Sequence, residues 1–180
     1  FVYNDGLLKQ IVNPKDAITA LDYDRDYNLN TVITPNKAVT SFNYDGNGNC
    51  VEIKNAKGRS QYRDFDLLGR VTVIKDFDKN HIRLSYDALD DVTLYRDDVK
   101  TVEYTYNGMH KMRSRSEAGA SLHFVYDTEE QLKKVINEHG EQYIFELDAA
   151  GNVIVEKGFD GLTRVYERNM AGWVTRVNRP

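Results

Sequence analysis

The chain has 180 residues, of which 24 are Lys or Arg and 28 are Asp or Glu, giving a formal net charge of −4 at pH 7. This mildly acidic balance argues against a nucleic-acid-binding scaffold, which carries a basic stripe or patch. The single cysteine, Cys50, has no partner in the chain for a disulfide, and no apolar run approaches the roughly 20 residues of a membrane-spanning helix.

An aromatic residue followed by Asp or Asn recurs along the chain every 20 or 21 residues. A fixed period is the signature of a repeat architecture, and the 12 Tyr, 12 Gly and only 3 Pro are typical of short strands and tight turns. We call the first residue of each pair the anchor and each period a copy. The anchors in chain order are Tyr3, Tyr23, Tyr44, Phe65, Tyr86, Tyr106 and Tyr126, followed by two degenerate copies at Leu147 and Arg168.

A tight turn is predicted directly after each anchor. The Asp that follows the anchor is suited to accept backbone N–H bonds in such a turn, which is a structural role that requires no proton transfer. Four residues after the anchor several copies have glycine, which takes a positive φ without steric cost. In other copies Tyr27, Asp90, His110 and Glu130 stand there, so the turn must tolerate a non-glycine residue or be rebuilt. The predicted turn residues are Asp24, Asp45, Asp66, Asp87, Asp127 and Asp148, with the repeat-turn glycines Gly48, Gly69, Gly151 and Gly172.

A second turn, rich in Gly, Asn and Asp, lies halfway through each copy and leaves two strands of about 5–7 residues per copy. The strand before each anchor alternates between apolar and polar residues; Ile82, Leu84 and Tyr86, for example, alternate with Arg83 and Ser85. The segment 128–137 has the pattern of a short amphipathic helix, but its place in the period predicts a turn and a strand. We expect about 16 strands, with anchor side chains mostly buried and aligned as a ladder across neighbouring hairpins.

These patterns predict an all-β fold, an array of antiparallel β-hairpins of about 20–21 residues each that forms a single curved sheet. The array covers residues 1–180 as one repeat region. The chain starts inside the first copy and stops within the last, so we expect it to be a fragment of a larger protein. No signal peptide is visible in it.

Sites for chemistry are not predicted, and we expect neither an enzyme nor a cofactor. Segments 45–49 and 76–80 resemble the start of a calcium loop, but they lack its sixth-position glycine and its twelfth-position bidentate glutamate, so turn chemistry is the better interpretation. The histidines lie at different positions of four copies, and Cys50 occupies a slot used elsewhere by Val and Leu. The aromatic residues Tyr62, Tyr95 and Trp173 are candidates for sugar stacking, although strands favour aromatics in any case.

The repeat resembles the YD-repeat family, which includes Rhs toxin shells, the C components of Tc toxin complexes, wall-associated proteins and teneurins. The residues that carry the resemblance to the pattern Y-D-x-x-G-R/N-x-V/L lie in segments 44–49, 65–71 and 147–153. In Rhs and Tc proteins such repeats coil into a hollow β-cocoon that holds a C-terminal toxin domain, released by autoproteolysis at a D-P-x-G-L-type segment. This chain contains no such segment, so neither self-cleavage nor a toxin is assigned to it.

The resemblance implies two functional hypotheses. The first is a structural segment of an Rhs-type shell that encapsulates a toxin used in competition between bacteria and delivered by type VI secretion. The second is a cell-surface repeat array for adhesion or carbohydrate binding. Both imply a bacterial protein that is exported or displayed on the cell surface. The expected partners are flanking YD repeats and a C-terminal toxin domain of the same polypeptide, with edge-strand self-association of the isolated fragment and no nucleic acid.

Overall fold

The computed structural model describes residues 1–179, and within them the chain consists of strands and turns without any helix. None of this part of the chain therefore forms a helix that could cross a membrane. The strands are β1 Val2–Asn4, β2 Leu7–Val12, β3 Ile18–Tyr23, β4 Leu29–Ile33, β5 Val39–Tyr44, β6 Cys50–Lys54, β7 Ser60–Phe65, β8 Val71–Lys75, β9 His81–Tyr86, β10 Val92–Arg96, β11 Thr101–Tyr106, β12 Met112–Glu117, β13 Ala120–Tyr126, β14 Leu132–Asn137, β15 Gln142–Leu147, β16 Val153–Lys157, β17 Thr163–Arg168 and β18 Val174–Asn178.

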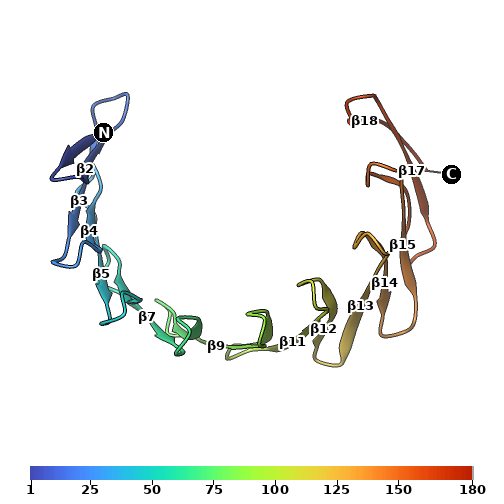
Figure 1. Ribbon diagram of the computed structural model, residues 1–180, viewed down its shortest axis with the longest axis horizontal. Coiled ribbons are helices and arrows are strands. Elements are labelled where there is room, and N and C mark those ends of the chain that lie inside the picture. The colour runs from blue at the N-terminus through green and yellow to red at the C-terminus, as the bar shows by residue number, and fades with distance from the viewer. Residues whose placement is uncertain (180) are drawn as a thin grey trace. The chain divides into compact units, whose positions relative to one another are not determined.

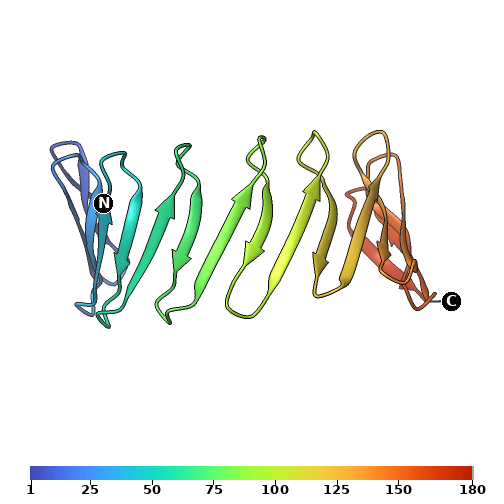
Figure 2. The same cartoon turned by 90° about the horizontal axis from the view of Figure 1, so that it is seen from below.

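The eighteen strands belong to one antiparallel sheet, which confirms the predicted all-β hairpin array. The chain divides into two compact units, the first made of residues 1–84 and 96–98 and the second of residues 85–95 and 99–180. Within each unit, strands that follow each other in sequence pair with each other, as β2 does with β3 and β13 with β14 (Figure 1). Within each unit, Figure 2 shows neighbouring hairpins side by side, with turns along both edges of the sheet.

Segment 128–137, which has a helix-like pattern, is a turn followed by strand β14, as its place in the period predicts. The eighteen strands of residues 1–179 exceed the expected sixteen or so because the two incomplete ends also form strands, β1 at one end and β18 at the other. In the first copy, Asp5 and Gly6 take φ of 50° and 80°, so a two-residue turn joins β1 to β2.

A β-bulge recurs beside the anchors. In the hairpin of β13 and β14, Val125 pairs with Lys134 but Tyr126 pairs with Leu132, so Lys133 is skipped. The same shift occurs beside the anchors Tyr3, Tyr23, Tyr44, Phe65, Tyr106, Leu147 and Arg168. Paired residues share a face of the sheet. The bulge therefore brings two residues three apart in the second strand, such as Leu132 and Val135, onto the face of the anchor, which we call the anchor face.

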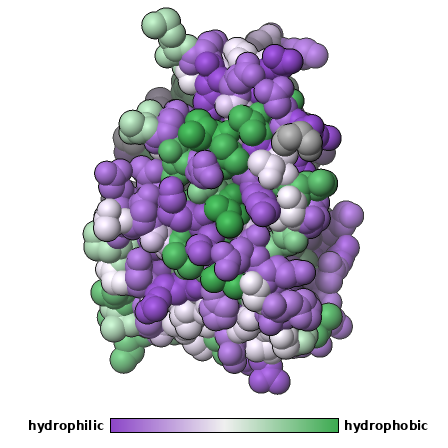
Figure 3. Space-filling view, turned by 90° about the vertical axis from the view of Figure 1, so that its right-hand side faces the viewer, coloured by the Kyte–Doolittle hydropathy of each residue, from purple (hydrophilic) through white to green (hydrophobic). Residues whose placement is uncertain are grey.

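Both units consist of a single layer of sheet (Figure 1). Because no second layer covers it within residues 1–179, only Val102 among the hydrophobic side chains is fully buried, at 1 % exposure. The anchors Phe65, Tyr86, Tyr106 and Tyr126 are half-buried. Most of each residue is thus covered, as expected, although none of the four is fully buried. Figure 3 shows hydrophobic residues gathered in a central band over the strands near the C-terminus, with hydrophilic residues on both sides.

Candidate functional site: the repeated anchor turn

The turn after each anchor is held by the side chain of the next residue. In the copy of Tyr44, one carboxylate oxygen of Asp45 accepts the backbone N–H groups of Asn47 and Asn49, both at 2.9 Å. The same pair of bonds, two and four residues ahead and at 2.9–3.0 Å, is made by Asp24, Asp66, Asp87, Asn107, Asp127, Asp148 and Asn169. The side chain thus satisfies donors that the strand ladder leaves free, as in an Asx turn.

Half-copy turns use the same device, as the Asn and Asp residues of the predicted second turn indicate. Asn13, Asn55 and Asn137 each accept the N–H groups two and four residues ahead at 2.8–3.1 Å. The signal was present, because an Asn stands at the end of the strand in these three copies. Both edges of the sheet are therefore closed by side-chain-capped turns in these copies.

The fourth residue after the anchor has a positive φ in every complete copy. The glycines Gly48, Gly69, Gly151 and Gly172 have φ of 77–83°. The non-glycine residues at the same position keep this conformation, with φ of 66° for Tyr27, 68° for Asp90, 60° for His110 and 61° for Glu130. The turn is thus conserved in shape, not rebuilt, and the four non-glycine copies carry backbone strain.

Tyrosine anchors also connect neighbouring copies. The hydroxyl of Tyr44 donates a hydrogen bond to the carbonyl oxygen of Leu29 at 2.8 Å. The hydroxyls of Tyr23 and Tyr126 donate in the same way to the carbonyls of Leu8 at 2.9 Å and Met112 at 2.8 Å. In each case the acceptor lies in the preceding copy, so the anchor fastens one hairpin to the next.

Arg168, at an anchor position without an aromatic ring, makes the same connection. Its guanidinium donates to the carbonyl oxygen of Val153 in the preceding copy, from Nη2 at 3.1 Å and from Nε at 3.3 Å. A third bond, from Nη1, reaches the Gly172 carbonyl at 2.9 Å. The period places Arg168 at this position, but only the structure shows that it replaces the tyrosine hydroxyl as the donor.

The surroundings of these groups shift their protonation. The side-chain amide of Asn49 and then its backbone N–H lower the pKa of the Asp45 carboxyl, and the backbone N–H of Arg70 is the main cause of the lowered pKa of Asp66. Burial raises the pKa of the hydroxyls of Tyr44 and Tyr126. All these shifts favour the ordinary charge states at neutral pH, in which the carboxylates accept and the phenols donate.

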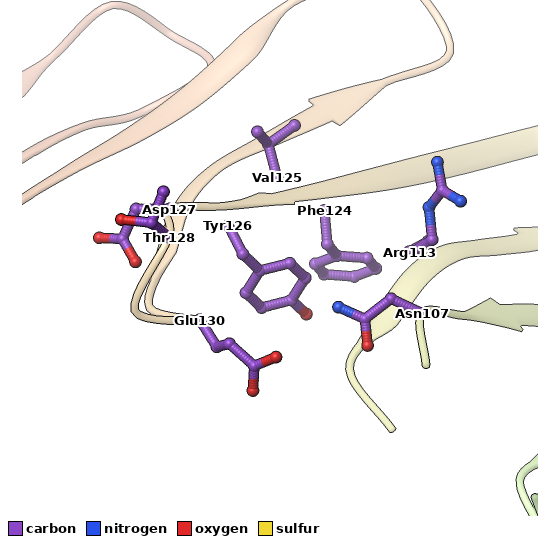
Figure 4. A pocket seen from close by; sticks show the side chains of 8 residues that line it. All are labelled: Asn107, Arg113, Phe124, Val125, Tyr126, Asp127, Thr128 and Glu130. Carbon is purple, nitrogen blue, oxygen red and sulfur yellow. The ribbon is translucent and has the colours of Figure 1, made fainter. Parts of the chain in front are cut away.

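A shallow hollow of about 390 Å³ surrounds the anchor Tyr126. Figure 4 shows the rings of Phe124 and Tyr126 side by side on one face, with Val125 pointing to the other. Asn107 and Glu130 lie near the phenol end of Tyr126. The anchor ring therefore fills space on the anchor face between its own copy and the copy before it.

A polar network interrupts the anchor face in the last copies. A carboxylate oxygen of Glu156, which pairs across the strands with Phe145, accepts a hydrogen bond from Tyr166 at 2.5 Å and forms an ion pair with Arg164 at 2.9 Å. The hydroxyl of Tyr166 is the first cause of the lowered pKa of Glu156. Because its oxygens are occupied by donors in this way, Glu156 is held as a carboxylate and not poised to take up a proton.

The two calcium-like segments form turns in the structure. Both oxygens of Asp45 face hydrogen-bond donors, since the second accepts the side-chain amide of Asn49 at 3.0 Å. Asp76 accepts the backbone N–H of Phe77 at 2.5 Å. Among residues 1–179, no three His, Cys, Asp or Glu side chains come together in a way that would hold a metal ion. Cys50 is half-buried and pairs with Tyr44 on the anchor face.

Solved structures with the same fold come from Tc toxin complexes. The crystal structure of TcdB2-TccC3-TEV matches with a TM-score of 0.77 and 14 % identity, covering 91 % of this chain and 11 % of that chain. The Photorhabdus luminescens Tc holotoxin pore matches with a TM-score of 0.67 and 14 % identity over 96 % of this chain and 11 % of that one. The crystal structure of TcdB2-TccC3-Cdc42 matches with a TM-score of 0.61 and 12 % identity, over 92 % and 12 %. The chain thus spans about a ninth of the length of these proteins.

Among curated proteins, none matches this sequence closely enough to count as a relative. The model of the family described as Teneurin YD-shell matches residues 59–155. This match covers more than half of the 180 residues and contains the anchors from Phe65 to Leu147. The protein is a structural repeat region and belongs to the teneurin YD-shell family.

Proposed function

We propose that these repeats form part of the wall of an Rhs-type shell that encloses a C-terminal toxin domain of the same polypeptide. The observation that carries this proposal is the single-layer sheet with a continuous series of anchor turns. A sheet whose hairpins are fastened to one another by side chains extends without a second layer, which is what a wall requires. The turn residues and anchors named above are the structural site of this wall.

The family and the fold support a role of these repeats in a shell. That the shell encloses a toxin domain is the part that we propose beyond them. The matched structures are named as toxin complexes, and their chains are about nine times as long as this one. We infer that residues 1–180 are a repeat region within a longer exported polypeptide. Flanking YD repeats would then pair with the outer strands β1 and β18, whose pairings within residues 1–179 are with β2 and β17.

The experiment is limited proteolysis of the full-length protein that contains these repeats. If the wall encloses a C-terminal domain, that domain is expected to resist trypsin until the shell is opened by denaturant, and to be digested rapidly when expressed alone. A C-terminal region digested at the same rate in both contexts, or a polypeptide that lacks such a region, would contradict the proposal. The separately expressed domain is the matched control.

A second candidate, a carbohydrate-binding surface array, is favoured by one specific cluster. Tyr62 is 47 % exposed, and hydrogen bonds from Ser60, Asn43 and Tyr62 lower the pKa of Glu52 beside it. Exposed rings flanked by planar polar groups suit the stacking of sugar rings. Glycan-array binding that is lost on Tyr62→Ala and kept on Tyr27→Ala, a change of another exposed tyrosine, would favour this candidate.

A further inference from the structure

An open hollow of about 350 Å³ lies where the series of aromatic anchors is interrupted by Leu147. Its apolar lining comes from Leu132, Phe145, Leu147 and Val153, and Gln131 and Gly151 complete it. Leu132 belongs to the preceding copy and Val153 to the same copy as Leu147, so the hollow lies between two hairpins on the anchor face.

The preceding copy shows what normally fills this position. There the phenol ring of Tyr126 lies beside Phe124, and its hydroxyl donates to the Met112 carbonyl at 2.8 Å (Figure 4). Leu147 stands beside Phe145 in the same arrangement, because each anchor is two residues beyond its phenylalanine on the same face. A leucine has neither the ring nor the hydroxyl, so the hollow beside Leu147 lacks the phenol that lies in the hollow beside Tyr126.

A hydrogen-bond acceptor is left at the same place. The carbonyls of Leu8, Leu29, Met112 and Val153 each accept a bond from the anchor of the following copy. The equivalent acceptor for Leu147 is the carbonyl of Leu132, fifteen residues earlier, as Leu29 is for Tyr44. Within residues 1–179 no side chain donates to the Leu132 carbonyl. The hollow therefore combines apolar walls with one acceptor at the position of a tyrosine hydroxyl.

We propose that this hollow binds the side chain of a tyrosine presented by a partner polypeptide. The ring would pack on Leu132, Phe145 and Val153, and the hydroxyl would donate to the Leu132 carbonyl. A polypeptide side chain fits better than a free small molecule, because the hollow is open on the anchor face and small-molecule sites enclose most of their ligand. A partner segment lying on the face would cover the opening itself.

The proposal is tested on the whole 180-residue chain by nuclear magnetic resonance, with p-cresol and N-acetyltyrosinamide as probes and N-acetylleucinamide as the control. Both phenols are expected to shift the methyl signals of Leu132, Leu147 and Val153, with dissociation constants on the order of millimolar for such small probes. The carbonyl carbon of Leu132 is expected to shift with the phenols and not with toluene, which has no donor. The absence of these shifts, or their appearance with p-cresol but not with N-acetyltyrosinamide, would overturn the proposal.

Two variants fill the hollow from within. Leu147→Tyr supplies both ring and hydroxyl, and Leu147→Phe supplies the ring alone; in either variant, the probe-induced shifts are expected to disappear while the β-sheet circular dichroism is unchanged. Tyr126→Leu is the reciprocal variant and is expected to create a second site, with new shifts at Met112. Probe binding that persists unchanged in a folded Leu147→Phe protein would show that the phenols bind elsewhere and would refute the assignment.

Discussion

The guanidinium of Arg168 donates two hydrogen bonds to the carbonyl oxygen of Val153, at 3.1 and 3.3 Å. The Tyr126 hydroxyl makes the equivalent contact with Met112 at 2.8 Å. What the anchor position requires in these copies is therefore a long side chain with a donor at its end, and aromaticity is one way to supply it. This explains how the chain keeps its period through a copy that has lost the tyrosine.

Arg168→Tyr is expected to keep the stability of the protein within about 0.5 kcal/mol, because the hydroxyl can take over the bond to Val153. Arg168→Ala is expected to destabilise by about 1–2 kcal/mol, since a half-buried carbonyl loses a charged donor. Urea unfolding monitored by circular dichroism measures both changes. Equal losses in the two variants would contradict the assignment of Arg168 as a replacement for tyrosine.

The backbone strain at Tyr27 can be tested separately from the contacts of its side chain. This residue has a φ of 66° and a side chain that is 72 % exposed. Tyr27→Gly is expected to stabilise the protein by about 0.5–1 kcal/mol, because relief of the strain exceeds the entropy cost of a glycine in the unfolded chain. Tyr27→Ala is the control: it removes the ring and keeps the strain, so its effect on thermal unfolding should be near zero. A Gly variant no more stable than the Ala variant would argue against strain.

The sequence was sufficient for the features that depend on local spacing. The period predicts that Tyr126 ends a strand and that Asp127 lies in a turn. Both features depend on local interactions, because the side chain of Asp127 bonds only to backbone groups two and four residues ahead. The bulge at Lys133 was not predicted, although its signal exists in the apolar pairs three residues apart, such as Leu132 and Val135. The sequence could not show that the burial of Tyr106 is incomplete, for a different reason. Alternation in a strand shows which face is apolar but not whether a second layer covers that face.

Asp45→Asn is expected to destabilise the protein less at pH 7 than Asp45→Ala, because only the Ala variant leaves two turn N–H groups without their acceptor. The amide oxygen of an Asn can accept both bonds, as Asn107 and Asn169 do at the same position. Thermal unfolding of the three proteins in one buffer measures the difference. A loss in the Asn variant as large as that in the Ala variant would mean that charge, and not geometry, holds the turn.

Acid is expected to destabilise the turns in a defined window. The pKa values of Asp45, Asp66 and Asp148 are lowered below the ordinary 3.8 by turn N–H groups and neighbouring side chains. A carboxyl whose pKa is lower in the folded state stabilises that state above pH 3.8, and this contribution is lost as pH falls through the lower, folded value. The triple Asn variant should therefore lose less stability than the parent between neutral pH and about pH 2. If the parent and the triple Asn variant lose the same stability over this pH range, these three carboxyls are not the cause of the acid destabilisation.

Phe65 offers a gain of stability by the addition of one atom. It is an anchor with a ring but no hydroxyl. Tyr44 shows which carbonyl such a hydroxyl would reach, because its own hydroxyl donates to the carbonyl of Leu29, fifteen residues earlier. The equivalent carbonyl for residue 65 is that of Cys50, which accepts no side-chain bond within residues 1–179. Phe65→Tyr is therefore expected to stabilise the protein by about 0.5–1.5 kcal/mol, the net contribution of one hydrogen bond.

The matched control for this gain is Tyr44→Phe, which removes the existing hydroxyl and should cost a similar amount. Combining the two changes should restore the stability of the parent to within about 0.5 kcal/mol, because the two bonds lie in different copies and their effects are expected to add. Equilibrium urea unfolding of the four proteins measures this cycle. A Phe65→Tyr protein less stable than the parent would show that the hydroxyl cannot reach the Cys50 carbonyl, and that the cross-copy bond depends on more than the identity of the anchor.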